Sequence, residues 1–96
     1  MSLLPDAEIE AALAALPDWR RDGAALRTDM RFRTFAEAFA MATRVALLSE
    51  KRNHHPDLTI GWGRLGIALT SHDAGGITRR DTDMAKVIAE WTRSKG

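Results

Sequence analysis

The sequence has no cysteine and no tyrosine, and its 96 residues include only three histidines. The absence of cysteine excludes disulfide bonds and thiolate metal ligands, and it fits a reducing compartment. Because tyrosine is absent as well, imidazoles are the main groups able to move protons near neutral pH. All three histidines lie between Glu50 and Asp81, so we expect any proton chemistry to reside in this stretch.

The sequence also lacks an excess of charge of one sign and a long apolar run. Fourteen Lys and Arg residues against thirteen Asp and Glu residues give a formal net charge of +1. This is too balanced for a nucleic-acid or membrane partner held by charge. No apolar run approaches the roughly 20 residues that cross a bilayer. The N-terminus has no secretory signal pattern, so we expect a cytoplasmic protein.

The composition that remains is that of an ordinary globular protein, with 45% hydrophobic and 28% charged residues. The length predicts one domain over residues 1–96. At this size folding hides only roughly 60 to 65% of the surface of the unfolded chain. The core is therefore small, and assembly into an oligomer would help to stabilise it.

Hydrophobic periodicity predicts the order helix, hairpin, helix, hairpin, helix. The first helix should end before Pro17, and the pair Asp22-Gly23 predicts a tight turn between two strands. The second of these strands alternates between an apolar and a charged face over residues 26–33. We interpret the three arginines of the charged face as solvated, rather than as a nucleic-acid surface, because Asp29 lies among them.

The longest predicted element is a helix over residues 34–52. It opens with the capping-box pattern of Thr34 and Glu37, and Pro56 prevents its continuation. Its charged residues form one narrow stripe, so its apolar surface is wider than one small sheet can cover. We therefore predict a homo-oligomer, either a dimer or a tetramer, built on this helix and with the sheet edges as a further surface.

A second hairpin is predicted with its turn at Gly63-Arg64 and with Trp62 on the packed side of its first strand. The pattern of residues 78–81 then caps a last helix. The predicted fold class is α+β: a single domain with an antiparallel four-stranded sheet and three helices packed on one face.

Glu50 and His54 are four residues apart at the end of the long helix, where a carboxylate could hydrogen-bond the imidazole and fix its tautomer. His55 precedes Pro56, which restricts its backbone, so the two neighbouring imidazoles should diverge. His72 ends the strand that pairs with the strand after His55, which returns it towards the same place. Three imidazoles in one pocket suit acid–base chemistry or a zinc ion. The adjacency of two of them is awkward for one metal, and we predict none.

The spacing of these residues resembles the pterin-4a-carbinolamine dehydratase family, also known as dimerisation cofactors of a homeodomain transcription factor. The family pattern is an acidic residue, His-His-Pro, an aromatic residue, His and Asp at fixed intervals. It is met here by Glu50, His54, His55, Pro56, Trp62, His72 and Asp81. The resemblance covers nearly the whole chain, including Trp19 and the segment around His72. Asn53 stands where some members carry Asp, and Trp62 stands where tyrosine is frequent.

The resemblance implies a dehydratase that converts 4a-hydroxytetrahydrobiopterin to quinonoid dihydropterin in tetrahydropterin recycling, with neither a metal nor an organic cofactor. Our hypothesis makes His54 and His72 the acid and the base, in either order, with His55 orienting the pterin and Glu50 tuning His54. The other predicted substrate-binding residues are Asn53, Ser71, Asp73, Trp19 and Pro56. Trp19 is equally well interpreted as a core residue, and we interpret Asp81 as a helix cap rather than a catalyst.

The same resemblance leaves two alternatives open. Some family members bind the helical dimerisation segment of a transcription factor, so the chain could be a binding module or transcriptional coactivator that uses the long helix. It could also act on another pterin, for example in molybdenum-cofactor metabolism. The sequence does not separate these pterins, because their shared bicyclic ring would make most of the contacts.

Overall fold

The structure, a computed structural model, describes residues 2–93. Its elements are α1 (Asp6–Ala14), β1 (Trp19–Asp22), β2 (Ala25–Arg31), α2 (Phe35–Arg52), β3 (Asp57–Gly61), β4 (Arg64–Leu69) and α3 (Arg79–Arg93). The predicted order of helices and hairpins is thereby confirmed.

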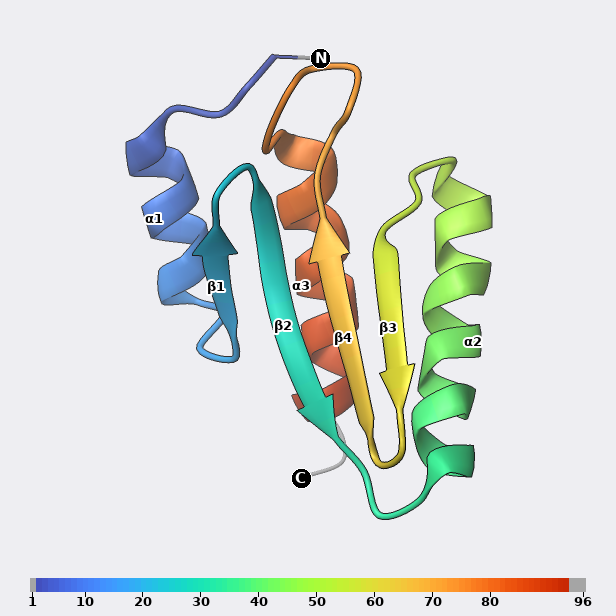
Figure 1. Ribbon diagram of the computed structural model, residues 1–96. Coiled ribbons are helices and arrows are strands. Elements are labelled where there is room, and N and C mark those ends of the chain that lie inside the picture. The colour runs from blue at the N-terminus through green and yellow to red at the C-terminus, as the bar shows by residue number, and fades with distance from the viewer. Residues whose placement is uncertain (1, 94–96) are drawn as a thin grey trace.

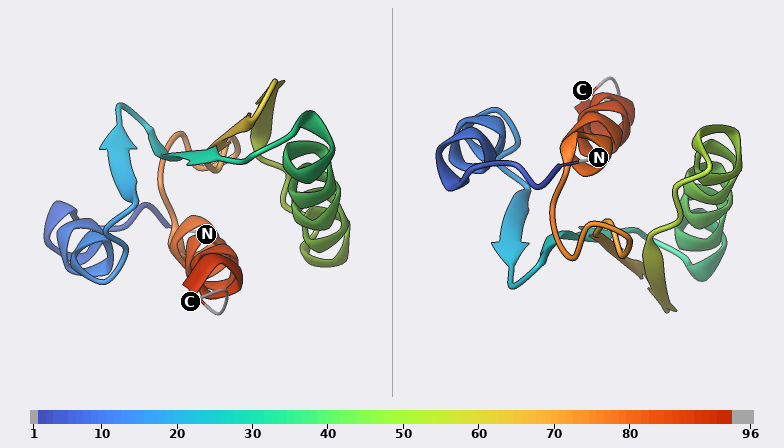
Figure 2. Two further views of the ribbon diagram at one scale, coloured as in Figure 1. Left: turned by 90° about the horizontal axis from the view of Figure 1, so that it is seen from below. Right: turned by 90° about the horizontal axis from the view of Figure 1, so that it is seen from above.

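The four strands form one antiparallel sheet in the order β1-β2-β4-β3. The second hairpin therefore joins the first through its second strand, with Thr28 of β2 opposite Ile67 of β4. All three helices lie on one face of this curved sheet, with α3 between α1 and α2, and the other face is uncovered (Figures 1 and 2). This confirms the predicted α+β class and the placement of the helices.

The core lies between α3 and the inner face of the sheet. Alternation along the strands turns every second side chain inward, and the helices contribute residues at helical spacing. The fully buried apolar side chains include Leu26, Leu65, Ile67, Leu69, Val45, Met84 and Ile88. The site described below is built on the ends of these packed elements.

The second hairpin turns one residue earlier than predicted, at Trp62 and Gly63. Gly63 has a φ of 66°, and a Cβ atom there would lie 2.8 Å from the carbonyl oxygen of Phe32. Because β3 ends at Gly61, Trp62 leaves the alternating pattern. The prediction that its side chain is packed is wrong, since it is 76% exposed.

The helix α2 contacts β3 and β4 with one side and leaves apolar side chains on its outer side. Phe35, Phe39 and Leu47 are all exposed, Leu47 by 67%, and the two phenylalanine rings stack with centroids 6.1 Å apart. The sheet of one chain therefore leaves much of the apolar surface of α2 uncovered, while the oligomer itself stays a prediction. No helix within residues 2–93 is long and apolar enough to cross a membrane.

Candidate active site

Three segments meet at one end of the molecule: the C-terminal end of α2, the loop of residues 70–78 after β4, and the first turn of α3 (Figure 1, top). Each carries residues that the sequence singles out. His54 follows α2, His72 lies in the loop, and Asp81 lies in the first turn of α3.

The end of α2 is set by Asn53, which adopts the left-handed conformation with φ 51° and ψ 45°. The backbone N–H of Asn53 donates to the carbonyl of Glu50 at 3.3 Å, and that of His54 donates to the carbonyl of Ser49 at 3.0 Å. These bonds satisfy the last carbonyls of the helix and turn the chain sharply. The turn directs the His54 side chain into the protein, where the residue is 8% exposed.

The buried carboxylate of Asp81 holds His54 and the start of the loop together. Its Oδ1 lies 2.5 Å from Nε2 of His54. Its Oδ2 accepts from the Ser71 hydroxyl at 2.8 Å and from the backbone N–H of Thr78 at 2.9 Å. A carboxylate only accepts hydrogen bonds, so Nε2 of His54 carries a proton and Nδ1 is the nitrogen that remains for a substrate.

His55 is held by a different carboxylate. Its Nε2 hydrogen-bonds Oε2 of Glu50, and the side chains of both residues are more than half exposed. The predicted Glu50–His54 pair is therefore wrong. It carried helical spacing two residues beyond the predicted end of the helix, whereas the left-handed Asn53 turns the chain there and sends the two histidines in different directions.

His72 lies at the surface, in a loop that is closed by its own backbone. The Ser71 N–H donates to the Gly76 carbonyl at 2.9 Å, and the Ser71 carbonyl accepts from the amides of Ala74 and Gly75. The His72 ring has no hydrogen bond to any residue from 2 to 93. Since Ser71 is bonded to Asp81, the same carboxylate that holds His54 also holds the residue next to His72.

The remaining predicted site residues divide between this end and the core. Asn53 and Asp73 are exposed here, Pro56 is half-buried, and Ser71 is buried against Asp81. Trp19 lies instead in the core, on β1. This strand forms one edge of the sheet, and β3 forms the other edge. The core position was one of the two that the sequence left open for Trp19.

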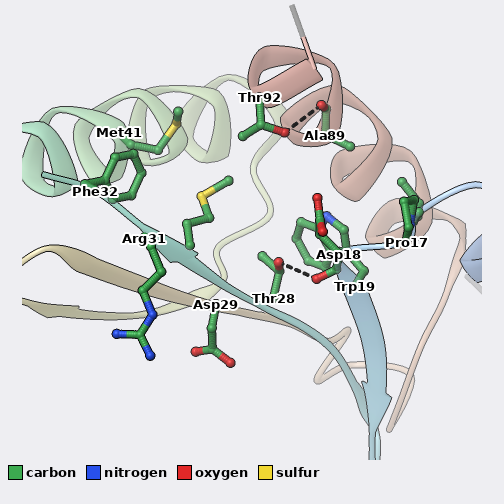
Figure 3. A pocket seen from close by; sticks show the side chains of 12 residues that line it. Pro17, Asp18, Trp19, Thr28, Asp29, Arg31, Phe32, Met41, Ala89 and Thr92 are labelled. Atoms are coloured by element: carbon green, nitrogen blue, oxygen red, sulfur yellow. Dashed lines mark hydrogen bonds between the residues drawn. The ribbon is translucent and has the colours of Figure 1, made fainter. Parts of the chain in front are cut away.

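Trp19 lines a cavity of about 500 Å³ between α3 and the strands β1 and β2, shown in Figure 3. Thr28 donates a hydrogen bond to the Asp18 carbonyl there at 2.6 Å, while Met30, Phe32 and other apolar side chains form most of the wall. No histidine lines this cavity. Its size suits a small ligand, and its ionisable acids are Asp18 and Asp29. Because all three imidazoles lie elsewhere, we place the candidate active site at the histidines.

Sequence reasoning missed the contact between Asp81 and His54, which are 27 positions apart. The helix-capping role expected for Asp81 is confirmed by its bond to the Thr78 N–H. A cap, however, uses only one of the two carboxylate oxygens. The second oxygen of a fully buried carboxylate needs a partner of its own, and His54 supplies it.

The arrangement presents two imidazoles, each bonded through Nε2 to a carboxylate, and a third imidazole on a closed loop. Such groups can hold, donate and accept protons near neutral pH. Across residues 2–93, no three His, Cys, Asp or Glu side chains are grouped so that they could hold a metal ion.

Asn53 offers a test that separates a structural role from substrate binding. Asn53→Ala should lower the free energy of unfolding by about 1 kcal/mol, because a Cβ residue other than Asn or Asp is strained at a left-handed φ. Asn53→Gly should leave stability nearly unchanged. Urea denaturation measures both variants. If Asn53→Gly keeps stability but raises the KM in the assay described below, the side chain contacts substrate. Equal stability of the Ala and Gly variants would contradict the structural role.

Comparison with known proteins finds one family that matches nearly the whole chain. Residues 2–91 match the family model described as pterin 4 alpha carbinolamine dehydratase. A protein of Thermomicrobium roseum with the provisional name pterin-4-alpha-carbinolamine dehydratase is 47% identical over 90 residues, which cover 94% of this chain and 97% of that protein. A protein of Rhizorhabdus wittichii with the same provisional name is 48% identical over 87 residues, covering 88% and 90%.

Two solved structures share the fold. The transcriptional coactivator/pterin dehydratase from Brucella melitensis has a TM-score of 0.87 and 30% identity, covering 93% of this chain and 97% of that chain. A pterin dehydratase-like protein identified as a RuBisCO assembly factor in the alpha-carboxysome has a TM-score of 0.64 and 24% identity, covering 76% and 87%. At that identity the second likeness shows the fold alone.

Proposed function

Because the chain belongs to the pterin 4 alpha carbinolamine dehydratase family, we propose that it dehydrates 4a-hydroxytetrahydrobiopterin to quinonoid dihydropterin in tetrahydropterin recycling. The observation that carries this proposal is the shared carboxylate of Asp81. It binds His54 through one oxygen and Ser71, the neighbour of His72, through the other. One carboxylate thereby holds the His54 imidazole and the backbone position next to His72, which come from distant parts of the chain.

The reaction requires two proton transfers. The bond between C4a and the hydroxyl oxygen breaks, and the oxygen keeps the electron pair and gains a proton so that it leaves as water. N5 loses its proton, and its electrons form the C4a=N5 double bond. One imidazole supplies the first proton and the other takes the second, so His54 and His72 in either order balance the reaction.

The other residues of the site would hold the pterin. His55, fixed by Glu50, would orient the ring. Glu50 would therefore act on His55, whereas the sequence predicted that it acts on His54. Asn53 and Pro56 border the same end of α2 and could contact the flat polar edge of the pterin. The carboxylate of Asp73 is bonded to Arg80, so the loop would offer the backbone of this residue rather than its side chain.

A dehydration assay tests the proposal. An aromatic amino-acid hydroxylase generates the 4a-carbinolamine, and its decay is followed with and without this protein, each in the presence and absence of a chelator. We expect acceleration that the chelator does not change. Decay no faster than in buffer would overturn the dehydratase activity, and loss of the acceleration with chelator would overturn the metal-free mechanism.

A second candidate function rests on the exposed outer side of α2, which carries Phe35, Phe39 and Leu47. The related structure from Brucella melitensis is described as a transcriptional coactivator as well as a pterin dehydratase. A binding module that covers this surface with a partner helix is therefore the alternative. Wild-type protein that lacks dehydratase activity but forms a one-to-one complex with a helical partner would favour it.

An active enzyme on a different pterin is the other alternative, and comparing pterins with different C6 side chains in the assay would reveal it.

We also propose that the chain assembles with itself through this side of α2, as a dimer or tetramer, with the sheet edges as a further surface. Phe39→Glu should raise the dissociation constant of the oligomer at least about tenfold, because assembly would then bury an unpaired carboxylate. Ala14→Glu, at an exposed position of α1, is the control and should change nothing. Sedimentation velocity at micromolar concentration measures both. A wild-type protein that sediments as a monomer would contradict the proposal.

A further inference from the structure

His72 lies between two residues that are both fixed to the first turn of α3. On one side, the Ser71 hydroxyl donates to Oδ2 of Asp81 at 2.8 Å. On the other side, Nη2 of Arg80 donates to Oδ1 of Asp73 at 2.6 Å. Two consecutive residues of α3 therefore hold the two chain neighbours of His72, while the His72 side chain itself is exposed.

The loop between these anchors is already folded by its own backbone. The Ser71 carbonyl accepts from the amides of Ala74, Gly75 and Gly76, and the His72 carbonyl accepts from the Gly75 amide. Gly75 permits this tight path with a φ of 80°. The internal shape of the loop is thus settled, and its side-chain contacts with α3 are the one from Ser71 to Asp81 and the one from Arg80 to Asp73.

The contact of Arg80 with the loop leaves part of the Arg80 side chain without a hydrogen bond. Its Nε atom is buried and has no hydrogen-bond partner among the described residues, while its Nη2 reaches Asp73. A buried donor without a partner destabilises the folded state. The contact with Asp73 is also largely exposed, and exposed ion pairs add little stability. Stability therefore does not explain the arrangement well, which suggests a role in positioning.

Near neutral pH the Asp73 carboxylate of this pair is ionised. The hydrogen bond from Arg80 lowers the pKa of Asp73 below its usual value; desolvation acts in the opposite direction, and the charge of Arg80 lowers the pKa further. The carboxylate is therefore ionised throughout the range in which imidazoles titrate. Its hold on Arg80 does not weaken until the pH falls to the acidic pKa of Asp73 itself.

We propose that Arg80 and Asp73 form a positioning pair that sets the place of the His72 imidazole relative to His54. The inference rests on the proposed function and deepens it. Asp81 fixes His54 and the adjacent Arg80 fixes the loop of His72, so one turn of α3 sets the relation between the two histidines. In this proposal neither side chain of the pair touches the substrate.

A double-mutant cycle in the dehydration assay tests the pair. Arg80→Gln and Asp73→Asn should each lower kcat about tenfold, because a small misplacement of a reacting group is costly. KM should stay within about threefold, and the double variant should be no slower than either single variant, since the second change removes nothing more. Arg79→Gln is the matched control, since Arg79 is the exposed neighbour of Arg80 and its side chain makes no hydrogen bond within residues 2–93.

Amide hydrogen exchange supplies a second measurement that does not depend on activity. In Arg80→Gln, the amides of Ser71, Ala74 and Gly76 should exchange at least about tenfold faster than in the wild type, whereas Arg79→Gln should leave them unchanged. The melting temperature should move by less than about 5 °C, because the ion pair is exposed.

The outcomes separate the two proposals. Unchanged exchange in Arg80→Gln, or kcat effects of the two single changes that multiply in the double variant, would overturn the positioning pair. Faster exchange together with an inactive wild type would leave the hold of Arg80 on the loop standing and would overturn the proposed dehydratase function and the catalytic role of the pair. Faster exchange with the expected kcat cycle supports both.

Discussion

Replacing His54 or His72 by alanine is expected to lower the rate of carbinolamine dehydration by about 10²- to 10⁴-fold, the usual contribution of a general acid or base. Each variant removes one of the two proton transfers that the reaction needs. The kinetic signature should be a fall in kcat. His55→Ala is the comparison, and because the proposed role of His55 is to orient the pterin, its main effect should be a higher KM.

The effect of His72→Ala on the rate is the easier of the two to interpret. The His72 side chain is exposed and makes no hydrogen bond within residues 2–93, so its loss should not disturb the fold. His54 is buried on Asp81, so its loss also leaves the Asp81 carboxylate with an unpaired oxygen. His54→Gln, whose amide Nε2 can take the place of the imidazole Nε2 and still donate to Asp81, separates that structural loss from the chemical one. If His72→Ala retained the wild-type rate within about twofold, the acid–base assignment would fail.

The second large effect is expected at Asp81, and it is an effect on stability. Asp81→Ala should lower the free energy of unfolding by about 3 to 5 kcal/mol, the cost of removing one partner from a buried charged network. The change leaves His54, the Ser71 hydroxyl and the Thr78 N–H without their shared acceptor. For a domain of this size, such a loss corresponds to a melting temperature lower by more than about 10 °C.

Asp83→Ala is the matched control for this prediction, because Asp83 lies on the same helix, is exposed, and forms no side-chain hydrogen bond in the described part of the chain. Thermal unfolding followed by circular dichroism compares the two. Asp81→Asn adds a further reading, since an amide keeps the shape but cannot accept at both ends. Equal melting temperatures for Asp81→Ala and Asp83→Ala would show that the carboxylate does not hold this end of the molecule together.

Local features of the fold were predictable because the physics that produces them is local. Thr34 accepts from the Glu37 N–H at 3.1 Å, as the capping-box pattern predicts. At the start of α3 the reciprocal bond forms, since the Asp81 carboxylate accepts from the Thr78 N–H. The alternation along β2 also separates its buried from its exposed side chains as expected, with Leu26 and Thr28 buried and Asp29 exposed.

Features that depend on distant parts of the chain were not predictable in this way. The hydrophobic periodicity of the strands does not predict which strand of the second hairpin pairs with β2, and in the structure it is β4 rather than β3. The expected Glu50–His54 pair failed because helical spacing does not reveal how the chain turns after a helix ends, here through the left-handed Asn53. Placing Trp62 on the packed side failed for a related reason, since the strand ends at Gly61, one residue before it.

The candidate site shows the same division. The family resemblance singled out His54, His72 and Asp81 together, but a sequence pattern carries no contacts. The structure supplies them by bringing the end of α2, the loop after β4 and the start of α3 onto one buried carboxylate. The same geometry shows that Arg80, which the pattern omits, holds Asp73 beside His72.

The central claim is that this chain dehydrates a pterin 4a-carbinolamine with His54 and His72, and a single-turnover stopped-flow experiment tests it most directly. Freshly formed 4a-hydroxytetrahydrobiopterin is mixed with excess protein, and the absorbance of quinonoid dihydropterin is followed. We predict that the wild type forms the product at least about 100-fold faster than buffer, and that the variant with both histidines changed to alanine binds the pterin but reacts close to the uncatalysed rate. A wild type no faster than buffer, or a double variant as fast as the wild type, would contradict the account.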